Sequence, residues 1–124
     1  MNRSNPLRFP ADVVAALDRI TQSAGGKRGA FLDRRSNRRG RRDLGITDEQ
    51  AWRIVAGLTI ADFHEGPSVD HHEPERELWV FAPLVGVRRA YVKIAFRPSD
   101  PVDRTALVIW SIHPARFEME RPYA

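Results

Sequence analysis

The sequence predicts an α+β fold, in which a small antiparallel β-sheet packs against helices that precede it in the chain. Apolar residues recur at helical spacing in the first half of the sequence, whereas three segments rich in β-branched and aromatic residues follow in the second half. The connections between these three segments are short and contain Gly or Pro, as antiparallel hairpins require. Helices followed by a contiguous group of strands are typical of the α+β class.

The first expected helix spans residues 10–23. Pro10 fits its first turn, and the pair Gly25-Gly26 ends it. Its apolar stripe consists of Val13, Val14, Leu17 and Ile20. After this helix, residues 30–32 fit either a short strand or a turn.

Two further helices are expected before the sheet. Ser36 is a suitable cap for an Arg-rich helix, which Gly40 interrupts and Gly45 closes. The next helix begins at Thr47, because Thr47 and Gln50 have the spacing of a capping box. The apolar face of that helix consists of Trp52, Val55, Ala56 and Leu58.

The strands are expected at residues 77–82, 90–97 and 106–113. Before them, residues 59–67 are expected to form a linker that ends in a Gly-Pro turn signal, and residues 68–76 a polar loop. No element is assigned to the last eleven residues, which prolines interrupt. These segments complete the predicted order of helices first and a β meander afterwards.

Length and composition restrict the class of protein. A chain of 124 residues suits one domain, 1–124, in which residues 1–8 are expected to be disordered. The absence of cysteine excludes disulfides, thiolate metal sites and cysteine nucleophiles. No apolar run is long enough to span a membrane, and the first residues lack the apolar core of a signal peptide. We therefore expect a cytoplasmic protein with no membrane partner and no cofactor.

The positive charge of the chain is concentrated in its first half. Residues 1–58 carry 12 basic and 6 acidic side chains, whereas residues 59–124 carry 8 and 10. Such a concentration favours an anionic partner such as RNA. The candidate RNA-binding residues are Arg34, Arg35, Arg38, Arg39, Arg41 and Arg42. An ordinary solvated basic segment, with Arg favoured over Lys by codon usage, is the alternative interpretation.

The strongest candidate site lies on two of the predicted strands. Alternation places Tyr91, Lys93 and Arg97 on one face of their strand. On the next strand it places Ser111 and His113 opposite Val108, Trp110 and Ile112. If the strands pair, the phenol, ammonium, guanidinium, hydroxyl and imidazole meet on one face. This set suits proton transfer and charge stabilisation during metal-free phosphodiester cleavage. A half-exposed sheet with polar residues facing water is the alternative.

A second polar cluster allows a different interpretation. It consists of His64, Glu65, Asp70, His71, His72 and Glu73. Imidazole and carboxylate ligands suit Zn or Mn, so a metal-dependent hydrolase centred on His64 and His71 is a lower-ranked alternative. The three tryptophans, Trp52, Trp79 and Trp110, could stack on bases or belong to the core.

Five motifs in sequence resemble the MqsR family of type II toxins over roughly residues 31–114. They are Asp43-Leu44-Gly45-Ile46-Thr47, Asp62-Phe63-His64-Glu65-Gly66-Pro67, Glu77-Leu78-Trp79-Val80-Phe81, Tyr91-Val92-Lys93-Ile94 and Ile109-Trp110-Ser111-Ile112-His113-Pro114. The resemblance implies a RelE-like fold and endonucleolytic cleavage of mRNA, with the ribose 2′-hydroxyl as nucleophile and no metal. It also implies a cognate antitoxin as partner, such as a helix-turn-helix protein.

The resemblance further implies roles for particular residues. The sheet-borne tyrosine of the family corresponds to Tyr91, and the basic group near the end of the last strand corresponds to His113. The chain departs from the founding member of the family at His113, Glu65 and Val80, where that member has Lys, Lys and Gln. We expect Tyr91 or His113 to exchange protons and Lys93 and Arg97 to stabilise charge. Glu65, Glu77 and Ser111 are expected to support them.

One alternative function belongs to another class of protein. A non-catalytic module could use the same Arg-rich surface to bind nucleic acid or an acidic protein. A small overlapping gene for a helix-turn-helix protein would favour the toxin over this module.

Overall fold

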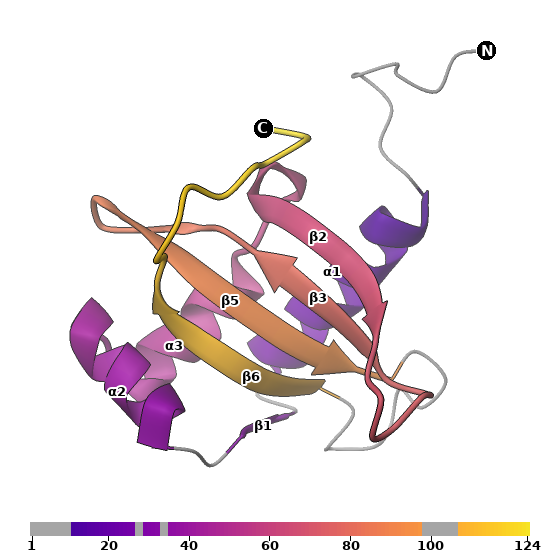
Figure 1. Cartoon of the computed structure of the whole chain (residues 1–124), viewed down its shortest axis with the longest axis horizontal. Helices are drawn as coiled ribbons and strands as arrows, with labels where there is room; N and C mark the ends of the chain where they lie inside the picture. Colours follow the sequence, from indigo (N-terminus) through magenta and orange to yellow (C-terminus); the bar gives the residue numbers. More distant parts are fainter. Residues whose placement is uncertain (1–10, 27–28, 33–34, 98–106) are drawn as a thin grey trace.

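The computed structural model describes residues 11–26, 29–32, 35–97 and 107–124. The expected disorder of residues 1–8 and the RNA-binding role of Arg34 concern positions outside these ranges. Three α-helices precede most of a six-stranded mixed sheet, which confirms the α+β class (Figure 1). Among the described residues, no helix combines the length and apolar character needed to cross a membrane.

The helices lie close to their expected positions. They are α1 (Ala11–Gly25), α2 (Arg35–Leu44) and α3 (Asp48–Ala56). The capping box of α3 is confirmed: the backbone N–H of Gln50 donates to Thr47 Oγ1 at 3.1 Å, and the Thr47 N–H donates to Gln50 Oε1 at 2.8 Å. A short 3-10 helix, η1 (Ile60–Asp62), then leads into the sheet.

The strands are β1 (Ala30–Phe31), β2 (Phe63–Val69), β3 (Glu77–Phe81), β4 (Leu84–Val85), β5 (Arg88–Phe96) and β6 (Leu107–Pro114). The sheet order is β1-β6-β5-β3-β2, with β4 paired to β5. All pairs are antiparallel except β1 with β6, which is parallel. The predicted sheet is therefore antiparallel over most of its pairs, and the short parallel pair at this edge makes it mixed.

The strand β2 corrects an expectation, because the sequence predicts a linker and a polar loop for its residues. Only Phe63 of this strand is buried, and Gly66 and Pro67 interrupt its sequence. Pairing with β3 forms the strand despite these residues, with register irregularities between Phe63 and Ser68. Proline is tolerated there because β2 lies at the edge of the sheet.

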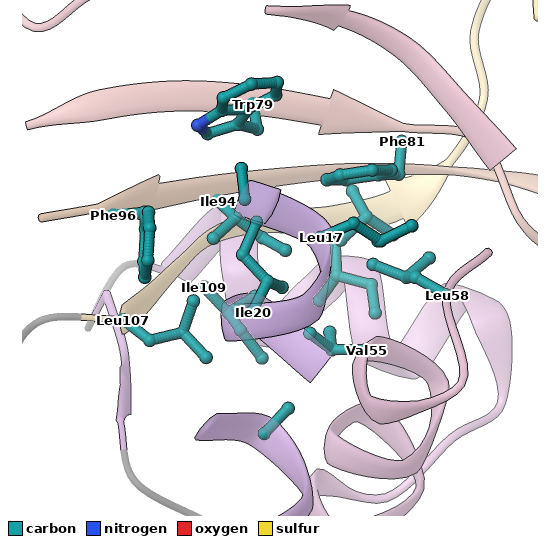
Figure 2. Packing of buried hydrophobic residues seen from close by; sticks show 14 of the residues in the cluster. Leu17, Ile20, Val55, Leu58, Trp79, Phe81, Ile94, Phe96, Leu107 and Ile109 are labelled. Carbon is teal, nitrogen blue, oxygen red and sulfur yellow. The ribbon is translucent and has the colours of Figure 1, made fainter. Parts of the chain in front are cut away.

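Helices α1 and α3 cover one face of the sheet, whereas the opposite face carries no helix (Figure 1). Figure 2 shows Leu17, Ile20 and Val55 from these helices packed against Trp79 and Phe81 from β3. All five side chains are at most 9% exposed. Burial of these side chains holds the helices against one face of the sheet. The opposite, helix-free face remains available for a site.

Helix α2 has a different place, beside β6 (Figure 1). The Asn37 side-chain amide donates to the Ile109 carbonyl at 3.1 Å and to the Leu32 carbonyl at 3.0 Å. Further along the helix, a Cβ on Gly40 would lie 2.0 Å from the Ile112 carbonyl oxygen and 2.7 Å from the Cβ of His113. The expectation that Gly40 interrupts this helix is therefore wrong, and the glycine instead permits the close approach of α2 to β6.

Candidate active site

The pairing of β5 with β6 brings the predicted proton-transfer residues together. Tyr91 is the register partner of His113, and Lys93 is the partner of Ser111. The Tyr91 and His113 rings are stacked, with centroids 4.9 Å apart and planes inclined by 6°. Tyr91, Lys93, Ser111 and His113 line one hollow of about 340 Å³. The predicted juxtaposition of these four side chains is therefore confirmed.

A β-bulge alters the expected faces of β6. Lys93 pairs with Ser111, but the next residue of β5, Ile94, pairs with Ile109. The extra residue is Trp110, so the alternation shifts at this point. Ile109 and Ile112 belong to the main core, whereas Trp110 lines the hollow with Ser111 and His113. The expectation that Trp110 faces away from His113 is wrong.

The hydrogen bonding of His113 selects one tautomer. Its Nδ1 atom lies 2.7 Å from the carbonyl oxygen of Pro114. Because a carbonyl can only accept, Nδ1 carries the hydrogen and donates it. In the neutral ring, Nε2 is then the atom with a free lone pair. The imidazole is thus oriented by the backbone and can accept a proton through Nε2.

The phenol of Tyr91 has a different electrostatic setting. Partial burial, and secondarily the negative charge of Glu65, raise its pKa above the ordinary value of 10.0. The phenol therefore stays protonated at neutral pH and is a proton donor there. Lys93 supplies positive charge on the same face, with Nζ 5.9 Å from the Trp110 ring centroid.

Three predicted site residues do not line this hollow: Arg97, Glu77 and Glu65, although the charge of Glu65 acts on Tyr91. Arg97 forms ion pairs with Glu73 and, at 3.7 Å, with Glu75, so its guanidinium is held by the loop before β3. Glu77 accepts a hydrogen bond from Trp79 Nε1 at 3.2 Å, on the side of β3 that carries the core. Arg97 as a charge-stabilising residue and Glu77 as a supporting residue are therefore corrected. Sequence alternation predicts a face for Arg97 but does not reveal its acidic partners.

The metal-binding alternative is not supported by the arrangement of its residues. His64 Nδ1 lies 2.6 Å from the Glu120 carbonyl oxygen, and its Nε2 lies 3.3 Å from Glu65. Asp70 is buried and accepts from the backbone N–H of His72 at 3.0 Å. In the described ranges, no three His, Asp or Glu side chains are grouped as metal ligands.

The arginines of α2 divide into two sets. Arg35, Arg38, Arg39 and Arg42, which we call the Arg stripe, recur at helical spacing and line a hollow of about 320 Å³. Arg41 is only 9% exposed. It donates to Asn37 Oδ1 at 2.8 Å, pairs with Asp48 at 2.9 Å and lies over the Phe31 ring. Arg41 is thus a packing residue, and its prediction as an RNA ligand is wrong.

Two residues of the site were missed by sequence analysis. Arg116 and Phe117 follow β6 and line the hollow beside Tyr91. Arg116 also lines a neighbouring hollow of about 330 Å³, together with Asp43 at the end of α2 and Arg88. No periodic pattern marks these residues, because they lie in a proline-broken segment. The positive charges of Arg116 and Arg88 lie, together with Asp43, between the end of α2 and the end of β6.

Comparisons of the chain with protein-family models, with curated proteins and with solved structures give no match.

Proposed function

We propose that this protein is a metal-independent endoribonuclease that cleaves mRNA in the cytoplasm. The observation that carries the proposal is the stacked pair of Tyr91 and His113, with Lys93 beside it. It combines an oriented proton acceptor, a phenol that remains protonated at neutral pH and a cation on one face. These groups are sufficient for transesterification at a phosphodiester.

The proposed reaction follows from the state of each group. His113 Nε2 takes the proton of the ribose 2′-hydroxyl, and the resulting oxygen attacks the adjacent phosphorus. As the new oxygen–phosphorus bond forms, the bond to the 5′-oxygen breaks, and Tyr91 donates its phenolic proton to that oxygen. The products are a 2′,3′-cyclic phosphate and a 5′-hydroxyl, and proton exchange with water restores both residues. Lys93 stabilises the negative charge that develops on the phosphoryl oxygens.

The Arg stripe supports the assignment of RNA as the substrate. Its four side chains lie on α2, whose opposite side contacts β6 at Ile112 and His113. Guanidinium groups in such a row suit contacts with successive phosphates. Arg116 and Arg88 lie around a hollow between this helix and the site. We propose that the RNA backbone follows this basic surface toward His113.

The biological role proposed is that of a type II toxin, neutralised by a cognate antitoxin. This part of the proposal rests on the motifs that resemble the MqsR family, among them Tyr91-Val92-Lys93-Ile94 and the segment that ends in His113-Pro114. A protein with this role is expected to arrest growth when it is produced without its antitoxin. Coexpression with a small neighbouring gene should relieve that arrest.

The test of the enzymatic proposal uses the purified protein and a single-stranded RNA in EDTA. We expect cleavage to continue, with 2′,3′-cyclic phosphate termini, and a 2′-O-methyl group at the cleaved nucleotide should abolish it. Cleavage that disappears with EDTA and returns with Zn or Mn would contradict the proposed chemistry. RNA binding without any cleavage would favour the second candidate, a non-catalytic module whose contacts are those of the Arg stripe.

A further inference from the structure

A large aromatic side chain lies exposed at the rim of the site. Phe117 is 54% exposed, although it belongs to a residue type that is usually buried. It lies against Tyr91, with ring centroids 6.2 Å apart and planes at 65°, and against His64 at 6.1 Å. One face of the hollow is therefore formed by an aromatic ring that is open to solvent.

The segment that carries Phe117 is fastened to the sheet on its C-terminal side. Met119 is 7% exposed and packs with Val80 and Ala82 on the helix-free face. Next to it, the Glu120 carbonyl accepts the hydrogen bond from His64 Nδ1. The Tyr123 ring stacks on Phe63, with centroids 5.5 Å apart. These contacts hold the exposed ring in a defined place, and the main apolar anchor of the segment is Met119 rather than Phe117.

A second aromatic ring borders the same hollow. Trp110 is brought there by the β-bulge and lies beside Lys93, whereas Phe117 lies beside Tyr91. Lys93 and Tyr91 are two residues apart on β5, so the two aromatic rings border the hollow at separate places. Arg116 and Lys93 add positive charge to this lining.

From this arrangement we infer that Phe117 and Trp110 form two stacking surfaces for the unpaired bases on either side of the cleaved phosphate. The inference deepens the proposed function and rests on it for the identity of the RNA. Aromatic rings bind base faces, which are accessible only when the nucleotide is unstacked, and the neighbouring cations match the phosphates. The site thereby selects single-stranded RNA and positions the scissile bond at His113.

The test measures binding separately from cleavage. The probe is a short single-stranded 2′-fluoro oligonucleotide, which lacks the nucleophilic 2′-hydroxyl, and a second probe lacks one central base. Loss of one base–aromatic stack should weaken binding about 5- to 100-fold. We expect Phe117→Ala to weaken binding of the intact probe within that range, and Phe117→Trp to restore it. Binding of the probe that lacks the base should be weak for the native protein and unchanged by Phe117→Ala.

Two controls separate stacking from other causes. Val87→Ala removes an apolar group that is 96% exposed at the β4–β5 turn, so it should leave binding unchanged. Phe117→Leu keeps an apolar group but removes the aromatic face, so it should bind as weakly as Phe117→Ala. Equal binding by Phe117→Leu and the native protein, or by the two probes, would overturn the inference.

The outcomes for the inference and for the proposed function are distinguishable. If the protein cleaves RNA but Phe117→Ala binds the intact probe as tightly as the native protein does, the inference is overturned and the ribonuclease proposal stands. Base-dependent binding through Phe117 in a protein that cleaves no RNA would support the stacking surfaces and overturn the enzymatic proposal. Absence of any binding to the intact probe would overturn the inference.

Discussion

The Nδ1 atom of His113 lies 2.7 Å from the Pro114 carbonyl oxygen, so the backbone of the next residue orients the imidazole. Catalytic histidines commonly need a hydrogen-bond acceptor that fixes their tautomer. In this protein that acceptor comes from the end of β6 itself. Consequently the backbone at the end of β6, and not a carboxylate elsewhere in the fold, determines which nitrogen of His113 accepts the proton.

Replacement of His113 tests this role directly. We expect His113→Ala to lower single-turnover cleavage by a factor on the order of 10² to 10⁴, the usual contribution of a positioned acid or base. The dissociation constant for a 2′-fluoro RNA should stay near the native value. The matched control is His71→Ala, because His71 is exposed and lies outside the hollow. Native turnover in the His113 variant would show that another group accepts the proton.

The Arg stripe is expected to contribute affinity without contributing to the chemical step. Replacing Arg35, Arg38, Arg39 and Arg42 by Gln should weaken RNA binding and flatten its dependence on salt, by about 0.7 in logarithmic slope for each lost phosphate contact. Cleavage at saturating RNA should persist. Arg41 stays native in this variant because its guanidinium packs inside the fold.

The control for the Arg stripe is Arg53→Gln, which removes an exposed arginine that pairs with Glu49 on α3. It should leave the salt slope unchanged. If the stripe variant is inactive at every RNA concentration while His113→Ala cleaves normally, the proposed division between binding and chemistry is wrong.

Replacement of Gly40 is expected to lower the stability of the protein, because this glycine lies in close contact with β6. Alanine is ordinarily better than glycine inside a helix by about 1 kcal/mol. At this position, however, the added Cβ would meet the Ile112 carbonyl oxygen at 2.0 Å, and overpacking costs about 1–3 kcal/mol or more. We expect Gly40→Ala to lower the free energy of unfolding, measured by urea denaturation, and to reduce cleavage because His113 must shift.

The matched control is Gly25→Ala at the end of α1, where the added Cβ would meet no atom within 4 Å beyond its chain neighbours and the backbone of its own helix. This substitution should leave stability unchanged or slightly increased. Equal stability of the two variants would show that α2 can move away from β6 without cost.

The raised pKa of Tyr91 predicts a particular behaviour at alkaline pH. The folded protein holds the phenolic proton more tightly than the unfolded chain, so the associated stability is present below pH 10 and is lost as pH rises through the folded value. The tyrosinate absorbance of the native protein and of Tyr91→Phe is followed against pH. The difference between the two curves should show the Tyr91 phenol titrating above pH 10. Glu65→Gln should move this titration to lower pH, because it removes the secondary, electrostatic cause. A titration at or below pH 10 would contradict the proposed environment.

Much of the fold follows from the sequence, because local patterns coincide with tertiary packing. The capping box at Thr47 and the alternation around Val92 and Ile94 predicted α3 and β5 close to their observed bounds. The strand β2 did not follow, because its sequence contains Gly66 and Pro67 and only pairing with β3 holds it in place. Tertiary hydrogen bonding overrode local propensity there.

The site was predictable where alternation alone decides the face, as for Tyr91 and Lys93. It was not predictable where one inserted residue changes the phase, as for Trp110, or where a partner is distant in sequence, as for Arg97 with Glu73. The burial of Arg41 depends on Asn37 and Phe31, and the charge run gave no indication of it.

The bulge in β6 also sets limits on how this sequence can change during evolution. Side chains of a strand alternate between its faces, so each residue between Ile109 and His113 determines which way those after it point. Trp110 and Ser111 share a face at the bulge, so deletion of either residue would restore regular alternation and keep His113 opposite Tyr91. Deletion of Ile112 would instead move His113 to the position opposite Val92, on the core face. Among descendants of this sequence, the bulge at Trp110 can therefore be lost, whereas the stretch from Ser111 to His113 should keep its length.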